Sequence, residues 1–180
     1  MKRMTCIVAA GMALAASAAG VAPAPHTVSA ATAPHAASAT VAARLPLCGV
    51  GVLRAAIVGE NAGAGNIYTT LAFRNVGPVS CVLRGYPGVS LVDGRGYQIG
   101  RSARRFATAA PLIALRPGGA ASTVIHTLNP GVGTTNCLRP STALRVYPPD
   151  SYAALLVRAR LSECLGVLEV RPLVAGLAGQ

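Results

Sequence analysis

Apolar and polar residues alternate with a period of two in several short stretches after residue 48. One face of the stretch 67–74 carries apolar or β-branched side chains, namely Ile67, Thr69, Leu71 and Phe73. Residues 153–160 and 168–171 alternate in the same way. Because successive side chains of a strand point to opposite faces, this period predicts β-strands with one buried face. Further strands are expected at 53–58, 89–92, 97–101, 122–128 and 144–147.

Turn signals separate these stretches. Pro87-Gly88 suits the centre of a type II turn, and Asp93-Gly94 predicts a hairpin. The glycine-rich stretch 59–66 is expected to be a flexible loop between strands, since no helix follows it to form a phosphate cradle. Further turns are expected at 117–118, 130–131 and 148–149.

No stretch after residue 46 shows a sustained helical period with caps. The pattern therefore predicts an all-β domain over 47–174. We expect an immunoglobulin-like antiparallel β-sandwich of seven to nine short strands, with a small barrel as the alternative. Residues 175–180 form a C-terminal tail.

The beginning of the chain has a different pattern. Lys2 and Arg3 precede an apolar, small-residue run over 6–21. This order is typical of a secretory signal peptide, here residues 1–30, with cleavage near 18 or 30. An uncleaved anchor is the alternative, although the run is shorter than the ~20 residues that span a membrane. The Ala/Pro/Ser/Thr-rich residues 31–46 are expected to be a flexible, disordered linker.

The cysteines indicate an oxidising compartment. Neither Cys6 nor Cys48 stands at the end of the apolar run, so we do not expect a lipoprotein. Four cysteines follow the leader and allow three disulfide connectivities. We favour Cys48–Cys81 and Cys137–Cys164, because each pair brackets a hairpin-like unit. No two of these cysteines are near neighbours, as zinc ligands usually are, so no metal site is expected.

Charge is the main chemical signal. The formal net charge is +11, and beyond residue 3 the chain has 14 arginines against 5 acidic residues. Four arginines are expected on one hairpin and the loop behind it, where they could contact an anion: Arg95, Arg101, Arg104 and Arg105. The candidate partners are an anionic envelope polymer, acidic lipid headgroups or an acidic protein. The chain has no Trp, five Tyr and two Phe, so recognition of bases or sugars by stacking on aromatic rings has little support, and nucleic acid is not expected.

Catalytic residues are scarce. His126 is the only histidine after the linker, and no local pattern sets a nucleophile beside it. Asp93 and Asp150 fall in expected turns, and Glu169 on the polar face of the last strand. We therefore expect no enzyme, no catalytic residues and no cofactor.

One motif is more specific. Residues 75–89 read Asn-Val-Gly-Pro-Val-Ser-Cys-Val-Leu-Arg-Gly-Tyr-Pro-Gly-Val, and similar pieces follow at 115–120, Cys137, Cys164 and 166–170. This order resembles the domain-of-unknown-function family 4232 of exported actinobacterial proteins, over about residues 48–173. The resemblance implies a secreted or envelope-attached β-sandwich, and it brings no established activity. Tyr86 is expected to pack in the fold rather than to bind a ligand.

Taken together, these features predict a secreted or cell-envelope protein that acts as a non-catalytic binding module. The alternatives are an envelope hydrolase with a site near His126 and a structural cell-wall protein.

Overall fold

The computed structural model describes residues 45–106, 110–131 and 135–177. The expected signal peptide, most of the linker and the end of the tail lie outside these residues. The described part is all-β, as expected, and contains no helix. It has twelve strands, more than the seven to nine expected: β1 Leu53–Gly63, β2 Asn66–Asn75, β3 Cys81–Arg84, β4 Gly88–Val92, β5 Gln98–Ile99, β6 Arg104–Arg105, β7 Leu112–Leu115, β8 Ala120–Leu128, β9 Ala143–Tyr147, β10 Leu155–Arg158, β11 Leu168–Val170 and β12 Val174–Ala175.

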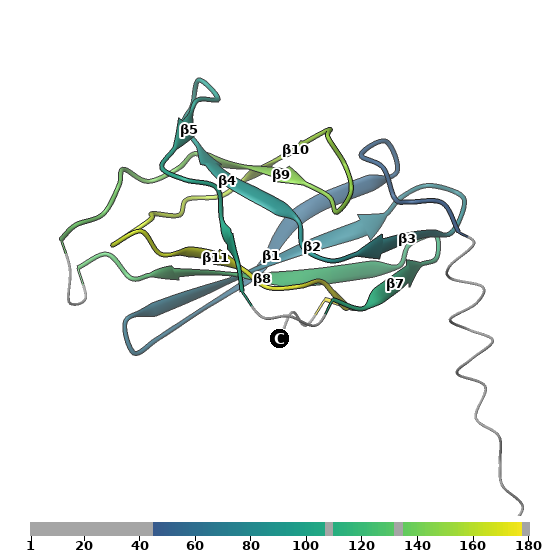
Figure 1. Ribbon diagram of the computed structural model, residues 1–180, viewed down its shortest axis with the longest axis horizontal. Coiled ribbons are helices and arrows are strands. Elements are labelled where there is room, and N and C mark those ends of the chain that lie inside the picture. Colours follow the sequence, from purple (N-terminus) through teal and green to yellow (C-terminus); the bar gives the residue numbers. More distant parts are fainter. Residues whose placement is uncertain (1–44, 107–109, 132–134, 178–180) are drawn as a thin grey trace, which may run out of the picture. The chain divides into compact units, whose positions relative to one another are not determined.

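The strands form three sheets. A six-stranded sheet has the order β1-β2-β8-β11-β6, with β12 also paired to β8. A four-stranded sheet has the order β10-β9-β4-β5, and β3 pairs with β7. Figure 1 shows the four-stranded sheet lying over the layer that contains β1, β2 and β8. Every pair of named strands is antiparallel except β6 and β11, which run parallel.

One core lies between the two larger sheets. Phe73 and Ile125 from the six-stranded sheet are fully buried in the same cluster as Leu91 and Leu144 from the four-stranded sheet. The alternation expected along β2 is confirmed, because Leu71 and Phe73 are buried while Arg74 is exposed. Burial of these apolar faces against each other makes the domain a β-sandwich.

The flexible loop that the sequence predicts for the glycine-rich stretch 59–66 is wrong. Strand β1 continues to Gly63, which pairs with Asn66 at the start of β2. Only Ala64 and Gly65 form the turn, with φ of 49° and 80°. Positive φ at both central residues is what a two-residue type I′ hairpin requires.

The other turns give a mixed result. Asp93 begins the β4–β5 hairpin as predicted, and its Oδ1 accepts hydrogen bonds from the backbone of Arg95 and Tyr97. The type II turn predicted at Pro87-Gly88 is wrong, because Gly88 is the first residue of β4. The positive φ of 102° lies at Gly85 instead.

The Asn75-Val76-Gly77 part of the motif has a structural role. The fully buried Asn75 donates from Nδ2 to the carbonyls of Val79 (2.8 Å) and Leu115 (3.0 Å). Its Oδ1 accepts from the backbone of Gly77 (2.9 Å). A Cβ on Gly77 would lie 2.8 Å from a methyl carbon of Val52, so a larger residue does not fit. The Asn75 side chain thus joins the end of β2 to β7 and to the turn between β2 and β3.

The four cysteines are paired as the sequence favoured. Cys48 is bonded to Cys81 and Cys137 to Cys164. The first bond joins the segment before β1 to the start of β3, where Cys48 also donates to the carbonyl of Val82. In the part of the chain that is described, no helix is long and apolar enough to span a membrane.

Candidate functional site

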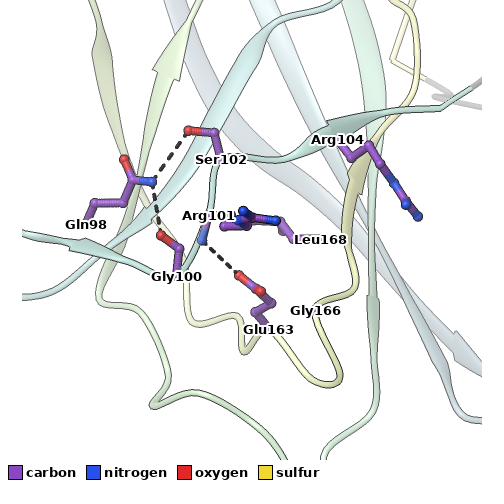
Figure 2. Close-up of a pocket in the computed structure, with 8 residues that line it drawn as sticks. All are labelled: Gln98, Gly100, Arg101, Ser102, Arg104, Glu163, Gly166 and Leu168. Carbon is purple, nitrogen blue, oxygen red and sulfur yellow. Dashed lines mark hydrogen bonds between the residues drawn. The ribbon is translucent and has the colours of Figure 1, made fainter.

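A pocket of about 610 Å³ lies between the β5–β6 segment and the chain that leads into β11. We call it the arginine pocket, and Figure 2 shows its lining: Gln98, Gly100, Arg101, Ser102, Arg104, Glu163, Gly166 and Leu168. A volume of this size falls in the range of roughly 300–1,000 Å³ that small-molecule sites occupy.

Hydrogen bonds fix the wall of the arginine pocket. The side chain of Gln98 donates to the carbonyl of Gly100 (3.1 Å) and lies 3.5 Å from the hydroxyl of Ser102. The backbone N–H of Arg101 donates to Oε2 of the buried Glu163 (3.3 Å). These bonds hold residues 98–102 in a defined bend beside the chain before β11 (Figure 2).

Gly100 is required for this bend. Its φ is 66°, and a Cβ there would lie 2.3 Å from Oε2 of Glu163. A larger residue would therefore be strained at this positive φ and would push the Glu163 carboxylate away from the backbone of Arg101. Glycine at this position lets the backbone of Arg101 reach Glu163.

The two arginines of the pocket differ in their contacts. The Arg101 side chain is exposed and its guanidinium has no partner among the residues that the structure describes. Arg104 donates from Nη2 to Oε1 of Glu169, while 76% of its side chain stays exposed. A guanidinium presents a planar fork of donors that matches a carboxylate or a phosphate. Arg101 therefore has its full donor set available for an anionic group in this pocket.

The structure separates the four arginines that we had grouped. Arg101 and Arg104 line the same pocket. Arg105 does not line this pocket, and its guanidinium carbon lies 5.6 Å from the ring centroid of Tyr86. Arg95 lies in the β4–β5 turn and does not line the arginine pocket. Arg104 and Arg105 are separated because neighbouring residues of a strand point to opposite faces, whereas Arg95 lies outside the strands.

A second group of polar residues lies next to this pocket, and we call it the His126 cluster: Asn66, Tyr68, Arg104, His126 and Glu169. His126 Nδ1 lies 3.2 Å from Oε2 of Glu169, and Nε2 lies 2.7 Å from Oδ1 of Asn66. The ring of Tyr68 stacks on His126 with centroids 4.9 Å apart. Strand pairing creates this cluster. His126 lies on β8, and it is paired with Tyr68 on β2 at one side and with Glu169 on β11 at the other.

Glu169 is buried, contrary to the exposed polar position that strand alternation predicted. The hydrogen bond from Arg104 lowers the pKa of its carboxyl below the ordinary value. Burial opposes this effect, and the hydrogen bond with His126 lowers the pKa further. The carboxylate therefore keeps its charge inside the fold because two basic groups surround it.

The His126 cluster does not have the geometry of a catalytic triad. Both ring nitrogens of His126 are engaged, one by Glu169 and one by Asn66. No hydroxyl or thiol bonds to this ring within the described ranges 45–106, 110–131 and 135–177. In the same ranges no three His, Cys, Asp or Glu side chains come together as metal ligands.

Sequence reasoning missed most of the pocket wall. The sequence patterns point to no role for Gln98, Ser102 or Leu168, and they offer Glu163 only as a carboxylate that could orient His126, not as a neighbour of Arg101. Glu163 directly precedes Cys164, whose disulfide to Cys137 fixes this part of the chain. No local pattern predicts that its carboxylate reaches Arg101, which is 62 residues away.

Comparison of the chain with known proteins identifies a family for which no activity is known. Residues 48–174 match the family described as domain of unknown function (DUF4232). No curated protein and no solved structure shows a significant match to the chain.

Proposed function

The chain belongs to the DUF4232 family, a family of unknown function, and from this premise we propose that it is a non-catalytic binding module of the cell envelope or the extracellular space. Two paired disulfides and the signal-peptide pattern of residues 1–30 support a compartment outside the cytoplasm. The ligand of the module carries a phosphate or a carboxylate.

The unpaired guanidinium of Arg101 carries this proposal. It stands in a pocket of about 610 Å³ whose wall is fixed by hydrogen bonds from Gln98 and to Glu163. These bonds order the backbone of the wall before a ligand binds, so the main ordering cost is that of the exposed Arg101 side chain, which a charge-assisted hydrogen bond offsets. The excess of basic over acidic residues accelerates the encounter with an anion.

The wall also limits the kind of anion. Glu163 brings a negative charge to the pocket, and Glu169 already compensates Arg104. A dense polyanion would meet repulsion from Glu163 as well as attraction from Arg101. The pocket therefore suits one phosphate monoester or one carboxylate, carried by an envelope polymer, a headgroup or an acidic protein side chain.

The proposal is tested by titration calorimetry with glycerol 3-phosphate and with glutarate, a phosphate and a carboxylate probe. We expect saturable binding of at least one probe and a loss of about tenfold or more in affinity in Arg101→Ala, consistent with one lost charge-assisted bond. Arg158→Ala is the control, because Arg158 is an exposed arginine on β10 away from the pocket lining. Equal binding by wild type, Arg101→Ala and Arg158→Ala would refute the assignment.

The alternative of an envelope hydrolase depends on His126. As a general base, its ring would have to release Asn66 or Glu169 before it could accept a proton from a nucleophile. Hydrolysis of wall glycan or ester substrates by wild type, abolished in His126→Ala, would favour that alternative over a binding module.

A further inference from the structure

Three of the five tyrosines of the chain line a second pocket, of about 370 Å³. We call it the tyrosine pocket, and its lining is Tyr86, Gly88, Arg105, Tyr147, Pro148, Pro149, Asp150, Ser151 and Tyr152. The side chain of Tyr152 is fully exposed. Tyr86 and Tyr147 are half-buried. Aromatic residues gathered around a surface pocket are typical of a binding site, since their exposed parts offer an apolar surface to a ligand.

Two of the rings are held in place by the fold. Gly88 and Tyr147 lie opposite each other in the β4–β9 pair, and a Cβ on Gly88 would lie 3.3 Å from the Cβ of Tyr147 and 3.5 Å from its Cδ2. The missing side chain thus lets the Tyr147 ring lie across the β4 backbone. On another side of the pocket, Tyr86 lies under the guanidinium of Arg105. The rings are therefore oriented before any ligand arrives.

The third side of the pocket is a rigid turn. The backbone N–H of Ser151 donates to the carbonyl of Pro148 (3.1 Å), which closes a four-residue turn with Pro149 and Asp150 at its centre. The Ser151 hydroxyl donates to the carbonyl of Ala153 and accepts from its N–H. These bonds order the segment that carries Tyr152.

Asp150 occupies a strained position in this turn. Its φ is 57°, a left-handed conformation that glycine adopts without strain and other residues adopt at a cost. The carboxylate has no partner among the residues that the structure describes, so it does not compensate for the strain by bonding within the fold. It remains an unpaired acceptor at the rim of the tyrosine pocket.

We propose that the tyrosine pocket binds a neutral saccharide. Sugar hydroxyls donate to the Asp150 carboxylate and accept from the Arg105 guanidinium, while the apolar C–H face of the sugar ring packs on Tyr147 and Tyr152. The pocket volume suits one or two sugar units. This inference goes beyond the anion site, and the two sites share none of their lining residues.

Two other ligand classes fit this pocket less well. An anionic ligand would be attracted by Arg105 and repelled by the unpaired Asp150, so it would gain less than a ligand whose hydroxyls bind both groups. A proline-rich peptide suits aromatic grooves, but its prolines have no N–H, so it offers fewer donors to the Asp150 carboxylate than the hydroxyls of a sugar. Burial of a charged acceptor without a donor is costly. A saccharide supplies the donors that the peptide lacks.

Because the chain has no Trp, its fluorescence comes mainly from tyrosine, and three of the five tyrosines line this pocket. The full-length chain is titrated with maltotetraose, cellotetraose and tetra-N-acetylchitotetraose as neutral probes. We expect a saturable fluorescence change with at least one probe, and a loss of about tenfold or more in affinity in Tyr152→Ala. Tyr97→Ala is the matched control, because Tyr97 is an exposed tyrosine of the β4–β5 hairpin outside the pocket. It should bind like wild type.

Asp150→Gly separates the structural role of this residue from its binding role. Glycine relieves the strain at φ 57°, so the variant should be at least as stable as wild type. It should nevertheless bind the saccharide about fivefold or more weakly, because the carboxylate is gone. Arg101→Ala should bind the saccharide normally, so failure of the anion site does not affect this test.

Three results would overturn the saccharide proposal. The first is the lack of saturation with all three probes up to about 10 mM, which corresponds to negligible affinity. The second is unchanged binding in both Tyr152→Ala and Asp150→Gly. The third is tighter binding of a proline-rich decapeptide than of any saccharide, which would assign the pocket to a peptide.

Discussion

Arg104 lies directly opposite Glu169 in the only parallel strand pair of the described sheets, and its guanidinium donates to the Glu169 carboxylate. The same carboxylate contacts His126 on the neighbouring strand. Arg104 lines the arginine pocket, whereas Glu169 lines an adjacent pocket of about 240 Å³ with His126 and Tyr68. One carboxylate therefore both anchors β6 to β11 and positions an arginine of the proposed anion site.

The first prediction concerns the stability provided by Glu169. Its pKa is lowered in the folded protein by Arg104 and His126, so the charged form is favoured by folding. This contribution is fully present above the ordinary value of 4.5 and is lost as the pH falls through the lowered folded value. We expect Glu169→Gln to cost about 1–2 kcal/mol at pH 7, less than for a fully buried pair because Arg104 is exposed.

Urea unfolding of wild type and Glu169→Gln at pH 7, 5 and 3 measures this effect. The difference in the free energy of unfolding should be similar at the two higher values and should shrink at pH 3. Glu60→Gln, at an exposed acid on β1, is the control and should differ little from wild type. A Glu169→Gln difference that is the same at all three pH values would contradict the role given to the carboxylate.

The second prediction concerns Asn75. In Asn75→Asp the Nδ2 donor becomes an oxygen that faces the carbonyls of Val79 and Leu115. Two buried carbonyls lose their donor and a charge is brought among them, so we expect a loss of about 3 kcal/mol or more. Asn61→Asp, on the exposed part of β1, should change stability by less than about 0.5 kcal/mol. Similar melting temperatures of the two variants would show that these bonds do not stabilise the fold.

The third prediction concerns the disulfides, which enclose sequence separations of 33 and 27 residues. Chain entropy gives a stabilisation of about 3.5 kcal/mol for a loop of either size. Replacing Cys48 and Cys81 together with Ser should lower stability by about that amount, as should the Cys137 and Cys164 double replacement. Denaturant unfolding measures both, and non-reducing peptide mapping should recover the same two pairs. Recovery of any other pair would contradict the structure.

The fourth prediction concerns Gly100 in the wall of the arginine pocket. In Gly100→Ala the new methyl group meets the Glu163 carboxylate and the backbone is strained at φ 66°, so we expect a loss of about 1–3 kcal/mol. Binding of glycerol 3-phosphate should weaken as well, because the Arg101 backbone is displaced. Gly94→Ala is the control, since nothing lies within 4 Å of a Cβ there. Full binding and stability in Gly100→Ala would contradict this account of the wall.

The sequence predicted those parts of the fold that depend on local patterns. The alternation from Ile67 to Phe73 predicted β2, and Asp93-Gly94 predicted the β4–β5 hairpin. The two-residue strand Arg104–Arg105 could not be found in this way, since two residues show no period and the strand exists only through its pairing with β11. Strand β7 consists of four apolar residues, 112–115, so the sequence shows no alternation of polar and apolar side chains there.

The sites were predicted less completely, because they combine residues that are distant in the sequence. The density of arginines in the sequence predicted Arg101 and Arg104 as site residues. It did not predict Glu163, which accepts from the Arg101 backbone and lies 62 residues away in the sequence. The five tyrosines appeared too few for aromatic recognition, yet three of them line one pocket from β9 and two connecting segments. Strand register decides both arrangements, and register depends on the whole sheet rather than on any local window.

The most direct measurement of the proposed anion site is the NMR signal of the arginine side-chain Nε–H groups during titration with glycerol 3-phosphate. We predict saturable shifts of the Arg101 signal, smaller shifts for Arg104 and an unchanged signal for Arg158. An Arg101 signal that stays unchanged at saturating phosphate, or shifts spread equally over all arginines, would contradict the assignment of the binding site to this pocket.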